Sequence, residues 1–209
     1  MSDEKPRHFS MIRDFHLADV LTLANGFAGM GALLALIKFQ GSGDRFFLWA
    51  AFVLFPIALI CDVLDGRVAR KSARGSSPLG QELDSLADVV SFGVAPAACG
   101  FVLGLQGGWD ALALTYFVAC GISRLARYNV TASTLAGPTG KVRYYEGTPI
   151  PTSLAIVAVW AWLAGRGLIG DAVPGGRWEI GPWGLHPLAL VYVASGSAMI
   201  SKTLRIPKP

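Results

Sequence analysis

The sequence predicts an all-α, polytopic membrane protein, and three observations support this fold class. Hydrophobic residues make up 53% of the 209 residues, and charged residues make up only 15%. The mean hydropathy is +0.48, which is high for a soluble domain. The apolar residues also gather into runs long enough for membrane-spanning helices, which need about 20 residues each. We therefore expect six transmembrane helices in one membrane domain covering residues 1–209.

Short polar or glycine-rich segments separate the apolar runs and set the expected helix limits. The expected spans are 17–39, 46–71, 80–105, 109–121 with its polar end at 123–129, 149–163 and 187–204. Pro56 and Pro96 are candidate kinks, and 130–148 is expected to be a functional loop. Residues 1–16 form a juxtamembrane segment, in which Phe9, Ile12 and Phe15 predict a short N-terminal amphipathic helix. A solvated tail fits the same residues.

The basic residues predict the orientation of the chain in the membrane. With a cytoplasmic N-terminus, every lysine and arginine except Lys38, Arg45, Arg166 and Arg177 falls on the cytoplasmic side. This bias places both termini in the cytoplasm and predicts an integral protein of the inner (cytoplasmic) membrane. The basic residues are scattered between apolar runs, so the net charge of +4 does not indicate nucleic acid as a partner.

Four aspartates stand where the second and third expected spans meet. Each would cost about 2.5 to 3.5 kcal/mol at membrane depth if nothing compensated its charge. Asp62 and Asp65 are separated by three positions and Asp84 and Asp88 by four, so each pair projects from one face of its helix. Facing carboxylates repel one another unless a hard divalent cation binds between them. The pattern therefore predicts a Mg²⁺ or Mn²⁺ site.

Small residues beside these aspartates indicate room for a ligand. Gly66, Ala69 and Gly80 lie on or next to the aspartate faces, and glycine inside a helix costs about 1 kcal/mol relative to alanine. Arg70 can bind a phosphate with its planar guanidinium group. On the first span, Asp19, Thr22 and Asn25 form a polar stripe that should face protein or a cavity instead of lipid.

The run Asp62-x-x-Asp65-Gly66-x-x-Ala69-Arg70 followed by Gly80-x-x-x-Asp84-x-x-x-Asp88 resembles the signature of the CDP-alcohol phosphotransferases, membrane enzymes of phospholipid synthesis. Nine residues separate Arg70 from Gly80, where that family usually has eight, so either Ser76 or Ser77 matches the hydroxyl that contacts the diphosphate. The segments at 21–29, 83–97, 123–129 and 144–151 are similar to bacterial and archaeal phosphatidylserine synthases within that family.

This resemblance implies transfer of a phosphatidyl group from CDP-diacylglycerol to L-serine, which gives phosphatidylserine and CMP. It implies that metal ions bind Asp62, Asp65, Asp84 and Asp88, and that Asp88 is also the general base in a direct displacement. The expected CDP-diacylglycerol contacts are Thr22, Asn25, Gly66, Ala69, Arg70, Ser77 and Gly80. Membrane lipid surrounds such an enzyme, and the resemblance also implies a homodimer.

The acceptor pocket needs positive charge for the carboxylate of serine. Arg124 and Arg127 lie three residues apart at the polar end of the fourth span, and Asn129 can add a hydrogen bond. The same arginines also suit anchoring of that end in the cytoplasm. Two other functions stay open: a sibling enzyme whose acceptor is glycerol 3-phosphate or an inositol phosphate, and a divalent-cation transporter that uses the aspartates as an ion site.

Overall fold

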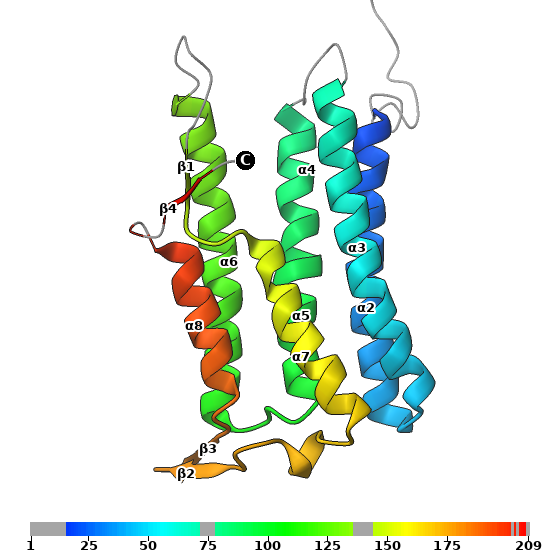
Figure 1. The fold of residues 1–209 in the computed structure, drawn as a ribbon, viewed down its shortest axis with the longest axis vertical. Coiled ribbons are helices and arrows are strands. Elements are labelled where there is room, and N and C mark those ends of the chain that lie inside the picture. The colour runs from blue at the N-terminus through cyan, green and yellow to red at the C-terminus, as the bar shows by residue number, and fades with distance from the viewer. Residues whose placement is uncertain (1–15, 72–77, 136–143, 202, 204, 208–209) are drawn as a thin grey trace, which may run out of the picture.

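The computed structural model describes residues 16–71, 78–135, 144–201, 203 and 205–207. Within these residues, six helical rods lie side by side along the long axis of the molecule (Figure 1). Their elements are α2 (Leu17–Ser42), α3 (Arg45–Lys71), α4 (Pro78–Asp88) with η1 (Val89–Val94) and α5 (Ala95–Val102), α6 (Gly108–Leu135), η2 (Ile150–Ser153) with α7 (Leu154–Gly165), and α8 (Ala189–Ile200). The all-α fold class is confirmed.

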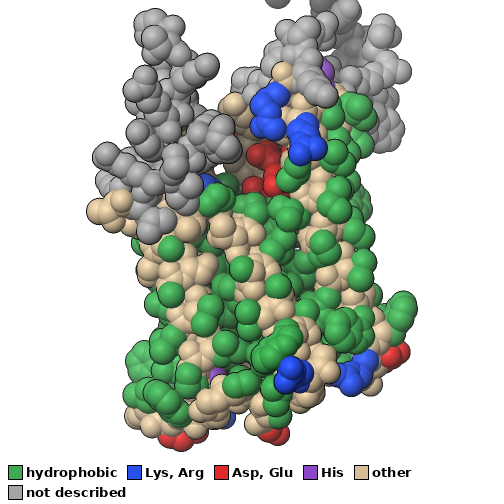
Figure 2. Space-filling model, in the orientation of Figure 1, with side chains coloured by type: hydrophobic (Ala, Val, Ile, Leu, Met, Phe, Trp, Pro, Cys, Tyr) green, Lys and Arg blue, Asp and Glu red, His purple; other side chains and the backbone are tan. Residues whose placement is uncertain are grey.

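Three helical stretches are long and apolar enough to cross a membrane: Leu17–Ser42, Arg45–Arg70 and Leu79–Val102. Two shorter apolar helices, Ile150–Gly165 and Ala189–Ile200, fall below a spanning length. Hydrophobic side chains cover the middle of the molecule, and charged side chains gather toward its two ends (Figure 2). The protein is therefore an all-α membrane protein, whereas the predicted number of six spans is not confirmed. The expected amphipathic helix within residues 1–16 lies outside the described residues, except for His16.

Several predicted limits need correction. The expected loop at 130–148 begins late, because α6 continues to Leu135. No glycine or proline interrupts residues 130–135, so the helix can continue beyond the apolar run. The last helix ends at Ile200 instead of residue 204. The third rod changes from α-helix to π-helix at η1, which ends two residues before Pro96. The missing N–H of Pro96 removes one α-helical hydrogen bond.

Two small antiparallel strand pairs were not predicted, because strands of three residues carry almost no periodic signal. β2 (Trp178–Ile180) pairs antiparallel with β3 (Trp183–Leu185) at the lower end of the bundle (Figure 1). β1 (Tyr144–Glu146) pairs antiparallel with β4 (Arg205–Pro207). The second pair ties the segment before α7 to the segment after α8. Both pairs therefore brace connections that the sequence presents as loops.

A buried hydrogen-bond chain joins three of the rods. The indole of Trp160 donates to the Tyr192 hydroxyl at 2.9 Å, and this hydroxyl donates to the carbonyl of Pro96 at 2.9 Å. Trp160 and Tyr192 are fully buried, so the polar atoms of both side chains are satisfied within the core. Gly100 leaves the necessary space, since a Cβ there would lie 2.6 Å from the Tyr192 hydroxyl oxygen. These two hydrogen bonds hold α5 against α7 and α8.

α2 approaches the third rod closely at Gly29. A Cβ on Gly29 would lie 2.6 Å from the Cα of Ser91, a fully buried residue of η1. The Ser91 hydroxyl donates to the main-chain carbonyl of Asn25 at 2.9 Å. The π-helical turn and Gly29 together therefore bring α2 within hydrogen-bonding distance of the residues around Asp88.

We predict that Gly29→Ala destabilises the protein by about 1 to 3 kcal/mol, because the new methyl group would push α2 away from Ser91. Gly41→Ala is the matched control in the same helix, since a Cβ on Gly41 meets no atom within 4 Å. Thermal unfolding of both variants in detergent micelles would measure the difference. Equal melting temperatures for the two variants would contradict this account of the contact.

Candidate functional site

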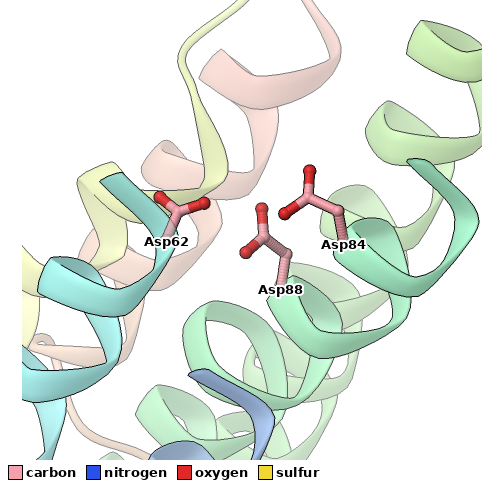
Figure 3. Close-up of side chains that lie close together, drawn as sticks. All are labelled: Asp62, Asp84 and Asp88. Carbon is pink, nitrogen blue, oxygen red and sulfur yellow. The ribbon is translucent and has the colours of Figure 1, made fainter. Parts of the chain in front are cut away.

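Three of the four predicted aspartates converge at one end of the bundle. Asp62 extends from α3, and Asp84 and Asp88 extend from α4, with their carboxylates directed toward one another (Figure 3). One oxygen of each carboxylate lies within 4.8 Å of an oxygen of the other two. Asp88 is buried, whereas Asp62 and Asp84 are half-buried. The spacing that predicted two facing aspartate pairs therefore produces one compact carboxylate cluster.

Asp65 is not one of these three mutually close carboxylates, and its side chain bonds to α2. It is 5% exposed, and one of its oxygens accepts a 2.7 Å hydrogen bond from the Thr22 hydroxyl. The predicted polar stripe of α2 is confirmed, because Asp19, Thr22 and Asn25 are all buried. Asp19 accepts the main-chain N–H of His16 at 2.8 Å and thereby caps the start of α2.

Asn25 lies against the carboxylate cluster. Its side-chain amide donates to Oδ1 of Asp88 at 3.0 Å, and the residue is fully buried. Asn25 was predicted to contact CDP-diacylglycerol, but Asn25 does not line the cavity described below. Its contacts instead orient the carboxylate of Asp88. The bond from Ser91 to the Asn25 carbonyl holds this part of α2 in place.

A cavity of about 570 Å³ opens beside the aspartates. One wall comes from α2 and α3 and includes Thr22, Asp65, Gly66, Ala69 and Arg70. The other wall comes from α4 and α6 and includes Gly80, Asp84, Ser85, Asp88, Arg124, Tyr128 and Asn129. Pro149, Ile150 and Pro151, at the start of the η2 and α7 rod, complete the lining. Figure 2 shows acidic side chains in this hollow, with basic side chains above them. The lining of the cavity therefore includes both acidic and basic side chains.

Most of the predicted ligand contacts meet in this cavity. Gly66 faces the guanidinium of Arg70, since a Cβ on Gly66 would lie 3.6 Å from Nη1 of Arg70. Arg124 and Asn129 both line the cavity. Arg127 is exposed and lies outside the lining, so the two arginines do not form an adjacent pair toward the cavity. Ser76 and Ser77 lie outside the described residues.

Ser85 was not predicted as a site residue, although it lines the cavity together with Asp84 and Asp88. Its hydroxyl oxygen accepts the side-chain amide of Asn129 at 3.0 Å, which links α4 to α6. The available signal was its position three residues before Asp88, on the same helix face. Gln81 and Tyr128 also line the cavity without having been predicted.

The carboxylate cluster fits a hard divalent cation. Its donor atoms are carboxylate oxygens, which Mg²⁺ and Mn²⁺ prefer. Among the described residues, the buried Oδ1 of Asp84 has no hydrogen-bond partner, although buried polar atoms are usually paired. A bound cation would satisfy this oxygen and offset the repulsion among the three carboxylates. Residues for such an ion are therefore present beside a cavity whose lining also includes Arg70 and Arg124.

Comparison with known proteins gives a consistent result. The family model described as CDP-alcohol phosphatidyltransferase matches residues 15–193. A CDP-diacylglycerol–serine O-phosphatidyltransferase of Saccharomyces cerevisiae is 47% identical over 211 residues, which cover 100% of this chain and 75% of the relative. An archaetidylserine synthase of Methanothermobacter thermautotrophicus is 36% identical over 76% of this chain and 60% of its own length. A Helicobacter pylori enzyme with the same name as the yeast relative is 35% identical over 68% of this chain and 55% of its own length.

Proposed function

The chain belongs to the CDP-alcohol phosphatidyltransferase family, and we propose that it transfers the phosphatidyl group of CDP-diacylglycerol to L-serine. The products are phosphatidylserine and CMP. The observation that carries this proposal is the convergence of Asp62, Asp84 and Asp88 beside one cavity that also contains Arg70 and Arg124. The relatives from yeast and Helicobacter pylori bear the name of this reaction, which supports serine as the acceptor.

CDP-diacylglycerol, the donor of the phosphatidyl group, is proposed to bind at the cavity wall formed by α2 and α3. Gly66 and Ala69 leave space for the cytidine part, and Arg70 binds a phosphate oxygen of the diphosphate. Asp65, with its bond from Thr22, extends the acidic wall on this side. Gly80 completes the pocket from α4, and the family's hydroxyl contact at Ser76 or Ser77 stays a prediction. The two acyl chains extend into the surrounding membrane.

The carboxylates of Asp62, Asp84 and Asp88 would hold Mg²⁺ or Mn²⁺, with Asp65 beside them. A divalent ion there would neutralise the charge of the diphosphate and make CMP a better leaving group. The choice between the two metals stays a prediction. The burial of Asp88 and its bond from Asn25 restrict the orientation of this carboxylate.

Asp88 is the proposed general base. Its carboxylate accepts the proton of the serine hydroxyl while that oxygen attacks the β-phosphorus of CDP-diacylglycerol. The bond from this phosphorus to the oxygen of CMP breaks, and CMP leaves with the electron pair. The displacement is direct and forms no covalent enzyme intermediate. Arg124 and Asn129 bind the amino acid part of the acceptor, with Arg127 at the exposed edge of α6.

The position of the site and of the basic residues supports a proposed orientation of the protein in the membrane. The site lies at the end of the bundle where α3 and α6 finish and α2 and α4 begin (Figure 1). The concentration of arginines and lysines near these ends supports a cytoplasmic location for the site and both termini. The six rods would then act as six spans of a single domain, residues 1–209. Location in an inner membrane and a homodimeric state stay predictions.

Asn25 offers a test of how the site is organised. We expect Asn25→Ala to lower kcat roughly 10- to 100-fold, because the carboxylate of Asp88 would lose the group that orients it. The KM for CDP-diacylglycerol should stay nearly constant, since Asn25 does not line the cavity. Steady-state CMP release would measure both constants, with exposed Gln106→Ala as the amide control. A higher KM for CDP-diacylglycerol with unchanged kcat would instead indicate that Asn25 contacts this substrate.

The proposed reaction is tested with the purified protein, CDP-diacylglycerol, a divalent cation and separate acceptors. We expect CMP release with L-serine and little with glycerol 3-phosphate or an inositol phosphate. Arg124 in the cavity wall would also suit a phosphate-bearing acceptor, so release with only those acceptors would identify a sibling enzyme. No CMP release with any acceptor, from folded protein, would overturn the enzyme assignment. Metal flux without nucleotide dependence would support a cation transporter instead.

A further inference from the structure

Ser85 lies on α4 but belongs neither to the proposed metal site nor to the proposed CDP-diacylglycerol site. It lies next to Asp84 and one helical turn before Asp88, and all three residues line the cavity. The Ser85 oxygen is 3.1 Å from the Gln81 carbonyl, 3.0 Å from Nδ2 of Asn129 and 3.3 Å from Oδ1 of Asn129. Ser85 is therefore the bridge between the aspartate helix and the cavity wall formed by α6.

The hydroxyl has one proton, and we place it in the bond to the Gln81 carbonyl. Donation to the Gln81 carbonyl leaves the Ser85 oxygen to accept from Nδ2 of Asn129, and this pattern uses the two shorter contacts. The Asn129 amide is then oriented by Ser85, and its Oδ1 remains available as an acceptor. A carbonyl oxygen in that position suits the ammonium group of an amino acid, which is a donor only.

The separation along α4 matches a short acceptor. Ser85 and Asp88 differ by three residues, which corresponds to roughly 4.5 Å along a helix axis. In serine, the hydroxyl and amino groups are on neighbouring carbons. Asp88 and the Asn129 amide held by Ser85 line the same cavity, so an acceptor with its hydroxyl at Asp88 can turn its amino group toward this amide. A longer spacer separates the two groups of the acceptor further and fits this arrangement less well.

We propose that Ser85 is a specificity-determining positioning residue, which holds the Asn129 amide so that its carbonyl accepts from the ammonium group of a short amino acid acceptor. The inference rests on the proposed function, because it assigns part of the acceptor site of that reaction. It adds a residue outside the aspartate motif and gives acceptor length a physical basis in the spacing along α4.

The test compares kinetic constants for Ser85→Ala, Ser85→Thr and the unmodified protein with L-serine and L-homoserine. We expect Ser85→Ala to raise the KM for L-serine about tenfold, with kcat nearly constant, as for loss of one hydrogen-bonded contact. The preference for L-serine over L-homoserine should fall by a similar factor. Ser85→Thr keeps the hydroxyl and should restore both values. Thr115→Ala is the control, since Thr115 makes the same bond to a carbonyl four residues earlier and lies outside the cavity.

Two results would overturn the inference while leaving the proposed reaction intact. In one, Ser85→Ala turns over L-serine with unchanged KM, and in the other its KM for CDP-diacylglycerol rises by the same factor as its KM for L-serine. A bond that only fastens α4 to α6 would lower the melting temperature without changing acceptor preference. If the unmodified protein releases CMP only with acceptors that lack an amino group, the proposed function and this inference both fail.

Discussion

Replacement of Asp88 by asparagine is expected to lower kcat for CMP release by roughly 10³-fold, while CDP-diacylglycerol still binds. An amide of the same shape cannot accept the proton of the serine hydroxyl. The fold should tolerate the change, because the amide oxygen of the new side chain can still accept from Nδ2 of Asn25. Steady-state CMP release gives the rate, and equilibrium binding of labelled CDP-diacylglycerol in detergent micelles tests the retained affinity.

Asp171→Asn is the matched control for this variant. Asp171 is exposed on η3 (Gly170–Ala172), away from the residues that line the cavity. Its replacement should leave kcat unchanged within experimental error. Full activity of Asp88→Asn would remove Asp88 from its proposed role as base. Loss of activity together with loss of donor binding would make Asp88 a binding residue instead.

Removal of divalent cations is expected to abolish CMP release, because three carboxylate oxygens within 4.8 Å of one another would otherwise face an anionic diphosphate. Dialysis of the purified protein against a chelator, followed by the assay with L-serine, measures the effect. Addition of Mg²⁺ or Mn²⁺ should restore the rate. Ca²⁺ should restore less, since it takes more ligands at longer distances.

The unfolding temperature of the chelated protein separates loss of catalysis from loss of structure. We expect the fold to persist without the metal, because the buried bonds among Trp160, Tyr192 and Pro96 do not involve the carboxylates. Activity that survives thorough chelation would contradict the proposed metal role. Rates that recover after Mg²⁺ addition in the unmodified protein but not in Asp62→Asn would tie the ion to the cluster.

The sequence predicted the chemistry of the site better than its three-dimensional arrangement. The spacing of the aspartates predicted that both pairs would face inward, because the helical period fixes which side chains share a face. It did not predict that Asp65 would turn to Thr22 while Asp62, Asp84 and Asp88 converge. That distinction depends on the rotation of α2, α3 and α4 about their axes, which packing determines.

Contacts between rods explain the other differences. Asn25 belongs to the predicted polar stripe, yet the close approach at Gly29 places its amide on Asp88 instead of in the cavity. Ser85 was overlooked because its partner, Asn129, is distant in sequence. Arg127 was paired with Arg124 from helical spacing alone, but only Arg124 lines the cavity. Each difference depends on a contact between helices that are far apart along the chain.

The most direct test of the central claim follows the oxygen atom that links serine to phosphorus. L-serine with a heavy oxygen isotope in its hydroxyl is incubated with the protein, CDP-diacylglycerol and Mg²⁺ or Mn²⁺, and both products are analysed by mass spectrometry. Direct attack by the serine hydroxyl predicts phosphatidylserine that carries the heavy isotope and CMP that does not. Unlabelled phosphatidylserine, labelled CMP or the absence of a serine-containing lipid would contradict the account.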